Sequence, residues 1–272
     1  MTSCVICPRR CAIDRAHRQG YCKAPWEPVV ANVTVHMWEE PLISGGRGSG
    51  TVFFAGCNLG CVFCQNHEIS QSAAGKVMAA PELADIFVKL EVEGVHNINL
   101  VTPGHFAGQI AEAIALAKGR GVKVPFVYNS NGYDAVPSLK LLDGLVDIYM
   151  PDLKYFDDAY GRRYSNVPDY FTVASKALPE MFRQVGRPVI RNGVLKKGLL
   201  IRHLVMPGLR EDSLAVLDWI KANVPSATVN VMSQYRPAHR AWEYKEIDRR
   251  PTAFEYQSVM DYSSKLGLRS AT

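Results

Sequence analysis

The sequence has no long hydrophobic run. Nowhere in its 272 residues do about 18 apolar residues follow one another, so no membrane-spanning helix is predicted. The N-terminus, Met1-Thr-Ser-Cys4, lacks the apolar core of a secretory signal peptide. Both absences predict a cytoplasmic protein, and in that reducing compartment the seven cysteines are better interpreted as metal ligands than as disulfide partners.

The sequence also lacks a strong excess of charge of one sign. It has 31 Lys and Arg against 26 Asp and Glu, which gives a formal net charge of +5. So mild a surplus indicates solubility, and neither a nucleic acid nor a membrane surface is expected as a partner. The hydrophobic content of 47% is enough for one α/β domain of barrel size and a small appendage.

Three cysteines follow a short apolar run. Residues 51–54 predict a buried strand, and the loop after it carries cysteines at C-x3-C-x2-C spacing, at Cys57, Cys61 and Cys64. Tetrahedral zinc and cubane clusters normally take four protein ligands, yet no further Cys or His follows until His67. A cluster on three thiolates leaves one iron open to a small molecule, whereas the alternatives are a zinc knuckle or ordinary buried cysteines.

Four more cysteines lie near the N-terminus, at Cys4, Cys7, Cys11 and Cys22. Pro8 and Gly20 are turn residues that can bend the chain around a metal. The set predicts either a zinc ion, which would staple a segment too short for its own core, or a second [4Fe-4S] cluster that relays electrons. The spacing does not separate these two alternatives.

Predicted strands and helices alternate from residue 51 onwards. Strands are predicted at residues 51–57, 97–101, 124–128, 146–150, 199–206 and 228–232. Helices are predicted at 81–94, 106–120, 137–145, 168–186, 212–223 and 251–266, the fifth with Asp212 as its N-cap. Before them, 29–35 predicts a further strand and the glycine-rich segment 43–50 a flexible connection.

Six strand–helix units imply a parallel sheet with right-handed crossovers. Because eight strands are needed to close a TIM barrel, we expect an α/β fold of the open, partial (β/α)6 type. The predicted division is a Cys-rich N-terminal segment at 1–50 and the partial barrel at 51–272. In such barrels the chemistry gathers at the C-terminal ends of the strands.

The cysteine loop resembles the signature of the radical S-adenosylmethionine (SAM) superfamily, including the aromatic Phe63 before the last cysteine. The resemblance implies a [4Fe-4S] cluster on Cys57, Cys61 and Cys64, with SAM chelating the open iron. It also implies that one electron cleaves SAM to methionine and a 5′-deoxyadenosyl radical, which the protein directs at a substrate. The partial barrel is the fold that this resemblance implies as well.

The second strand is followed by Thr102-Pro-Gly104-His105. Radical SAM proteins usually carry a Gly-Gly-Glu-Pro-like segment here, whose backbone receives the amino group of SAM. This chain has no Glu, but the Thr102 hydroxyl and free carbonyls can still accept hydrogen bonds from an ammonium. His105 is interpreted as a SAM contact or proton donor, or alternatively as a polar loop residue.

The next two strands end in Asn129-Ser130-Asn-Gly-Tyr and Met150-Pro-Asp152-Leu-Lys154. Both resemble segments of the pyruvate formate-lyase activating enzyme and its relatives that close around SAM and hold a monovalent cation. Carried over by position, Asn129, Ser130, Met150 and Asp152 form that cation site, although Asn129 replaces an acid. Independently, Asp152 and Lys154 lie on one side of an extended strand end and offer opposite charges to a zwitterion. The alternative is a surface ion pair.

On the fifth strand, Arg202 and His203 must point to opposite faces, so one of them faces the lumen. Arg202 stands in the place of a functional arginine of the activating enzymes, which implies a SAM carboxylate or ribose hydroxyl as its partner. After the sixth strand, Gln234 and Tyr235 stand where those enzymes carry a histidine near the adenosine. Tyr235 is predicted to stack on adenine, to line the substrate pocket, or simply to pack.

These features predict a radical SAM enzyme that removes hydrogen from a protein or peptide, as in glycyl-radical activation. The alternatives are a radical SAM enzyme acting on a small molecule and a non-catalytic iron–sulfur or zinc protein. A low-potential electron donor of the flavodoxin or ferredoxin type is the implied partner.

Overall fold

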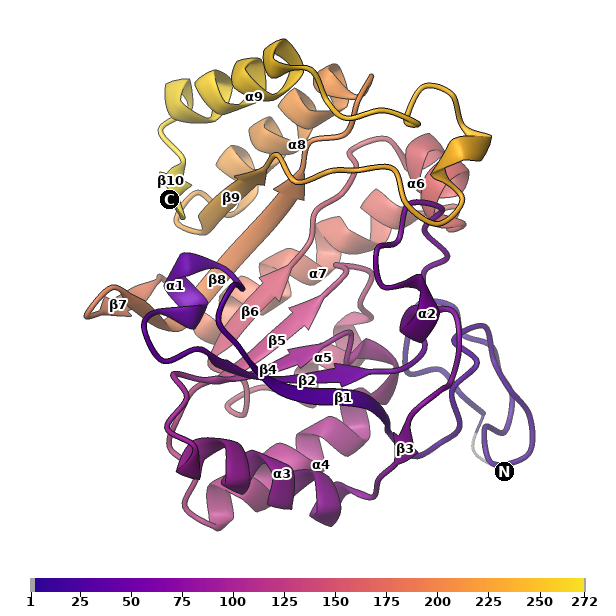
Figure 1. The fold of residues 1–272 in the computed structure, drawn as a ribbon, viewed down its shortest axis with the longest axis vertical. Coiled ribbons are helices and arrows are strands. Elements are labelled where there is room, and N and C mark those ends of the chain that lie inside the picture. The colour runs from indigo at the N-terminus through magenta and orange to yellow at the C-terminus, as the bar shows by residue number, and fades with distance from the viewer. Residues whose placement is uncertain (1–2, 272) are drawn as a thin grey trace.

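Six parallel strands form the centre of the molecule (Figure 1). The computed structural model describes residues 3–271. The strands lie side by side in the order β2 (Ser49–Phe54), β4 (Ile98–Val101), β5 (Phe126–Ser130), β6 (Ile148–Pro151), β8 (Val194–Leu204) and β9 (Thr228–Met232). Each pairs with the next in parallel. The predicted partial (β/α)6 barrel is therefore confirmed.

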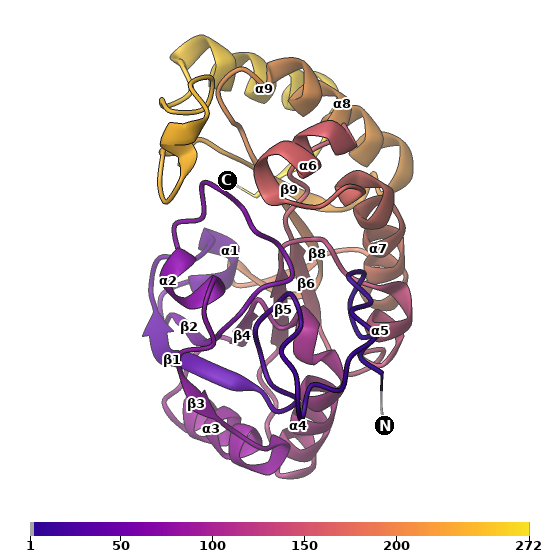
Figure 2. The same ribbon diagram turned by 90° about the vertical axis from the view of Figure 1, so that its right-hand side faces the viewer.

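The central strands are buried on both faces. All five residues of β5 and all four of β6 are buried, as expected for strands of a parallel sheet covered on both sides. The crossover helices are α3 (Ala80–Val92), α4 (Ala107–Gly119), α5 (Val136–Lys140), α7 (Tyr170–Val185), α8 (Arg210–Asn223) and α9 (Ala253–Lys265). Figure 2 shows α5, α7 and α8 along one side of the sheet. All six predicted helices are present, although α5 is shorter than predicted.

Further strands extend the sheet at both ends. The predicted strand near the N-terminus is β1 (Val29–His36), which pairs antiparallel with β2 and with β3 (Lys76–Val77). The sheet therefore crosses the predicted division at residue 50. The analysis of the sequence missed β3, β7 (Val189–Arg191), β10 (Arg269–Ser270), α2 (His67–Ser70) and α6 (Asp158–Ser165).

The segment 43–50 was predicted to be a flexible connection, and this was wrong. A short helix, α1 (Pro41–Ser44), precedes β2, and Ile43 is fully buried. Ile43 belongs to an apolar cluster with Val127, Ile148, Met150, Leu195, Leu200 and Ala271. Several of these residues lie two positions before polar residues that line a cavity, so they share the inner face of the sheet. α1 thus packs into the barrel lumen on the N-terminal side of the residues that line the cavity.

The predicted N-cap of α8 was also wrong. The helix begins at Arg210, with Leu209 at the N-cap position. The Asp212 carboxylate instead accepts hydrogen bonds from the backbone N–H groups of Phe156, at 3.0 and 3.1 Å, and Asp157, at 2.8 Å. Asp212 therefore fastens the loop after β6 to α8, and burial raises its pKa to about 6.

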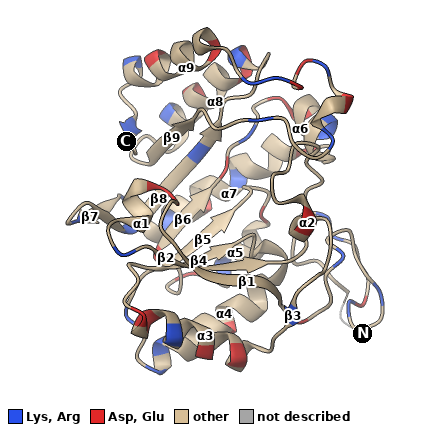
Figure 3. Cartoon of the chain, in the orientation of Figure 1, with Lys and Arg blue, Asp and Glu red and all other residues tan. Residues whose placement is uncertain are grey.

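Charged side chains of both signs occur on α3, in keeping with the small net charge (Figure 3). Within residues 3–271, no helix combines the length and the apolar character that crossing a membrane requires.

Candidate active site

The cysteine loop begins at Gly56, directly after β2. Gly56 has a φ of +79°, a conformation that favours glycine, and a Cβ at this position would collide with the carbonyl oxygen of Cys22. Its N–H donates to the carbonyl of Ile69 at 2.9 Å, which ties the start of the loop to α2. The turn therefore directs the three cysteines away from the strand and over the C-terminal ends of the neighbouring strands.

One cavity of about 450 Å³ brings most of the predicted site residues together. Its walls come from the cysteine loop, from the C-terminal ends of β4, β5, β6 and β8, as expected for a parallel barrel, and from His36 at the end of β1. The predicted site residues that line it are Cys57, Cys61, Cys64, Thr102, Asn129, Ser130, Asp152, Lys154 and Arg202.

Each of the three thiols has a hydrogen-bonding neighbour. Cys57 Sγ accepts from the side-chain amide of Asn131 at 3.4 Å, Cys61 Sγ lies 3.0 Å from Ser165 Oγ, and Cys64 Sγ lies 3.2 Å from Ser70 Oγ. Such contacts orient sulfur ligands and tune the potential of an iron–sulfur cluster. None of the three neighbours was predicted, because each lies outside the motif.

The donor set of this loop suits an iron–sulfur cluster. All three side chains are thiols that line one cavity, and thiolates are the usual ligands of a [4Fe-4S] cluster. Burial raises the pKa of Cys57 to about 12 and that of Cys61 to about 11. Assembly of a cluster would therefore release protons.

Asp152 is the centre of a charged network on the cavity wall. Its Oδ2 lies 2.5 Å from Lys154 Nζ, and its Oδ1 accepts from Arg202 Nε at 3.0 Å. Arg202 Nη2 also donates to Asn129 Oδ1 at 2.8 Å. Although burial opposes ionisation, Arg202 and Lys154 hold the pKa of Asp152 below its usual value. Both carboxylate oxygens thus already face side-chain cations where the resemblance implies a monovalent cation.

Arg202 and His203 take opposite faces of β8, as their alternation predicts. Arg202 lines the cavity, whereas His203 is buried and its Nδ1 lies 2.7 Å from the carbonyl oxygen of Leu153. Thr102 has a φ of +60° although it is β-branched, and its N–H donates to the carbonyl of Asn129 at 2.9 Å. A strained residue of this kind is typical of functional sites.

His105 does not line the cavity. It is 1% exposed, its Nε2 lies 2.9 Å from the carbonyl oxygen of Ala55, and its own carbonyl accepts from Arg15 at 2.6 Å. Burial lowers its pKa to about 4. This placement favours neither a SAM contact nor a proton donor, and it is not a polar loop residue either: His105 supports the backbone before the cysteine loop. Gly104 lies in the same 3-10 helix (Gly104–Phe106) and faces Asp134.

Phe63 and Tyr235 also lie behind the cavity wall. Their ring centroids are 5.7 Å apart, and both side chains are buried. The Tyr235 hydroxyl donates to the carbonyl of Ile247 at 2.8 Å, so of the three predicted roles the geometry favours packing. The residue before it, Gln234, lines a second cavity.

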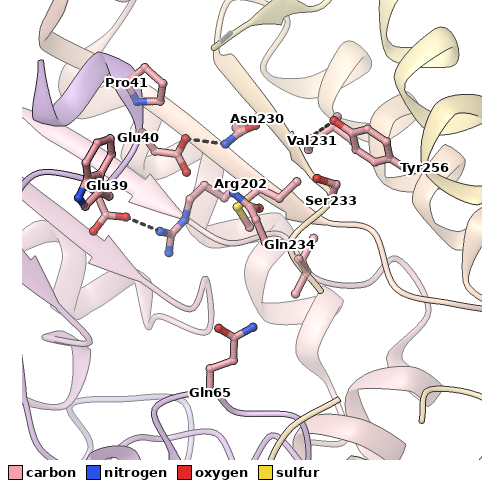
Figure 4. A pocket seen from close by; sticks show the side chains of 13 residues that line it. Glu39, Glu40, Pro41, Gln65, Arg202, Asn230, Val231, Ser233, Gln234 and Tyr256 are labelled. Atoms are coloured by element: carbon pink, nitrogen blue, oxygen red, sulfur yellow. Dashed lines mark hydrogen bonds and ion pairs between the residues drawn. The ribbon is translucent and has the colours of Figure 1, made fainter. Parts of the chain in front are cut away.

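Two carboxylates that were not predicted from the sequence lie next to the site, on the two residues that precede α1. Glu39 Oε1 lies 3.1 Å from Arg202 Nη1, and its Oε2 accepts from Asn99 at 2.9 Å. Glu40 Oε2 accepts from Asn230 at 2.5 Å. Both line a second cavity of about 530 Å³, and Glu39 and Arg202 line both cavities (Figure 4). The only signal in the sequence was a pair of acids before Pro41, which has no characteristic spacing.

The Cys-rich segment packs directly on the cysteine loop. Arg9 donates to the backbone carbonyl of Asn58 at 2.8 Å and to that of Asn166 at 2.6 Å, and its guanidinium lies 3.5 Å from the ring centre of Tyr21. In the segment, Cys4, Cys7 and Cys22 are buried and Cys11 is partly exposed. The segment therefore covers one side of the loop.

The family model of the radical SAM superfamily matches residues 51–231, which is more than half of the chain and includes every strand of the barrel except the first residues of β2 and the end of β9. The chain belongs to the radical SAM superfamily. Among curated proteins, the uncharacterized protein MJ0674 of Methanocaldococcus jannaschii is 34% identical over 280 residues. That match covers 98% of this chain and 75% of the relative.

Two solved structures are similar in fold to this chain. HydG, a maturase of the [FeFe]-hydrogenase, matches with a TM-score of 0.56 and 13% identity, over 84% of this chain and 52% of HydG. anSMEcpe with bound AdoMet and a Cp18Cys peptide matches with a TM-score of 0.51 and 12% identity, over 79% of this chain and 60% of that chain. This radical SAM chain thus spans little more than half the length of either protein.

Proposed function

We propose that this radical SAM enzyme holds a [4Fe-4S] cluster on Cys57, Cys61 and Cys64 and removes a hydrogen atom from a protein or peptide. The observation that carries the proposal is the single cavity that these thiols share with Asp152, Lys154 and Arg202. When bound, the cluster supplies the electron that splits SAM into methionine and the 5′-deoxyadenosyl radical that attacks the substrate.

The charged residues of the cavity would bind the methionine part of SAM. Lys154 and Arg202 are cations beside the place where a SAM carboxylate would lie, and Asp152 can accept from its ammonium. Thr102 would add its hydroxyl and carbonyl oxygens, which stand where the superfamily usually presents backbone acceptors. In this arrangement the residues hold a zwitterion in one orientation and bring its sulfonium toward the cysteines.

The second cavity is the proposed substrate cavity. It adjoins the first through Glu39 and Arg202, so a group held there lies next to bound SAM. Exposed Trp38 is among its lining residues, which gives a chain segment access from the surface. The peptide bound to the structural neighbour anSMEcpe supports a peptide substrate for this chain by analogy of fold.

The four N-terminal cysteines are proposed to form a second metal site, holding either zinc or a second cluster. Radical SAM enzymes need a reductant, and a low-potential flavodoxin or ferredoxin is the proposed donor. Metal analysis of the purified protein separates the alternatives for the second site. About eight irons per chain would indicate two clusters, and about four irons with one zinc would indicate a structural zinc site.

The main experiment is anaerobic reconstitution followed by addition of dithionite and SAM. We expect 5′-deoxyadenosine and methionine from the wild type and none from Cys61→Ala. His67→Ala is the matched control, because His67 is the next metal-binding side chain after the motif and should not be needed. If the wild type binds iron but releases no 5′-deoxyadenosine, the proposed function is wrong.

A further inference from the structure

The second cavity contains a buried carboxylate without an ionic partner. Glu40 is 7% exposed, and within residues 3–271 the only hydrogen bond of its carboxylate comes from the neutral amide of Asn230. In the same part of the chain, no Lys, Arg or His side chain forms an ion pair with Glu40. Burial raises the pKa of Glu40, and the charge of Arg202, which is itself paired with Glu39 and Asp152, only partly offsets this effect. Burying an unpaired charge is costly, so such a group is expected to have a ligand.

The charged side chains that line the two adjoining cavities are unequal in number. Three carboxylates, on Glu39, Glu40 and Asp152, face two side-chain cations, on Lys154 and Arg202. Asp152 and Glu39 take up both cations through contacts of 2.5 to 3.1 Å. Glu40 is therefore the carboxylate without an ion pair, and Figure 4 shows it directed at Asn230 while Glu39 is directed at Arg202.

The Glu40 side chain is held in place by the fold without a ligand. Glu40 directly precedes α1, whose Ile43 is buried in the lumen, and its carbonyl accepts from the N–H groups of Ile43 and Ser44 at 2.8 and 2.9 Å. Asn230, its hydrogen-bonding partner, lies on β9 opposite Arg202 of β8. A carboxylate fixed from two elements is pre-organised for binding.

The remaining walls fit an aliphatic cation. Leu204, Val231 and Met232 supply apolar surface, and Trp38, which is 87% exposed, supplies an aromatic face. An aromatic ring near a carboxylate is a usual setting for an ammonium or guanidinium group, while apolar side chains pack against its methylene stem. A neutral or anionic ligand would leave Glu40 unpaired.

We propose that Glu40 and Asn230 bind a cationic aliphatic group of the substrate, an ammonium or guanidinium such as that of a lysine or arginine side chain. The inference rests on the proposed function, because it assigns a substrate to the cavity beside the SAM site. It goes further by naming the charge of the group that enters the cavity and the residue that recognises it.

The test is a binding experiment on the reconstituted protein with SAM, without reductant. The probes are the tripeptides acetyl-Gly-Lys-Gly-amide and acetyl-Gly-norleucine-Gly-amide, which differ by one charge, and 1,5-diaminopentane as a free amine. We expect the wild type to bind the lysine peptide about tenfold more tightly than the norleucine peptide, as for one charged hydrogen bond. Glu40→Gln should abolish this preference, and the control Glu93→Gln, at the exposed C-cap of α3, should keep it.

The outcomes show whether Glu40 recognises a cation at all, and whether that cation belongs to a peptide or to a small amine. Preference for the lysine peptide supports a peptide substrate, whereas Glu40-dependent binding of the diamine alone supports the same recognition of a small amine. Equal binding of the lysine and norleucine peptides together with no binding of the diamine, or a preference that survives Glu40→Gln, overturns the inference. SAM affinity of Glu40→Gln is measured in parallel, and a loss there would assign Glu40 to SAM and also overturn it. Because no probe is turned over, these results are independent of the cleavage assay.

Discussion

Removing the Arg202 guanidinium should destabilise the protein more than any other single change in the charged network. Arg202 contacts Glu39 at 3.1 Å, Asp152 at 2.9 Å and Asn129 at 2.8 Å, and its side chain is 16% exposed. Arg202→Met keeps the length and apolar stem of the side chain but leaves Glu39 without a cation. Breaking a buried ion pair on one side typically costs 3–5 kcal/mol.

Because the network borders a cavity, we take the lower end of that range. Arg202→Met should lower the free energy of unfolding by about 3 kcal/mol, which corresponds to a fall in Tm of about 6–10 °C for a chain of this size. The assay is guanidinium and thermal unfolding of the metal-free protein, followed by circular dichroism. Glu39→Gln should cost less, about 1 kcal/mol, because Arg202 keeps Asp152 as a partner.

Two further variants make the reasoning refutable. The double variant Glu39→Gln/Arg202→Met should lose about 1–2 kcal/mol less of the free energy of unfolding than the two single variants lose together, because the two residues share one interaction. Glu40→Gln should instead raise the Tm, because it removes an unpaired buried charge. A cost for Arg202→Met below about 1 kcal/mol, or strict additivity, would refute this account of the network.

Two other predictions concern the strained Thr102 and the buried His203. Thr102→Gly should raise the free energy of unfolding by about 1 kcal/mol, because glycine adopts a φ of +60° without strain, yet weaken SAM binding measured by calorimetry; unchanged SAM affinity would count against the threonine as a ligand. His203 has its pKa lowered to about 4 by burial, so below pH 6.5 the unfolded chain binds a proton that the folded protein does not. Stability is therefore lost as the pH falls, by about 2 kcal/mol from this residue between pH 7 and pH 5. Denaturant unfolding at both pH values should show a smaller loss for His203→Asn, and an equal loss would contradict the assignment.

The site residues that were predicted best from the sequence are those at the C-terminal ends of the barrel strands. Cys57, Asp152 and Arg202 follow or end buried strands, and parallel strands bring their C-terminal ends to one edge, so their meeting in one cavity follows from the strand pattern alone. Thr102, Asn129 and Lys154 were found by the same reasoning.

The residues that were missed depend on tertiary packing. Glu39 and Glu40 reach the lumen only because α1 folds into it, and nothing in the local sequence requires that fold. Tyr235 lies beyond the end of β9, where alternation no longer fixes direction, and it turned out to pack against Phe63. His105 was misplaced because the 3-10 turn after Thr102 points it inward.

The contact between the two cysteine-bearing segments affects how far the cysteine loop is exposed to solvent. Tyr21 and Cys22 lie so close to Gly60 and Gly56 that neither glycine has room for a methyl group. The first segment therefore covers one flank of the cysteine loop, and it would shield a cluster held there from water and dissolved oxygen. Shortening the chain ahead of β1 would strip that shield away, so oxygen sensitivity should increase even where all three cysteines of the loop are intact.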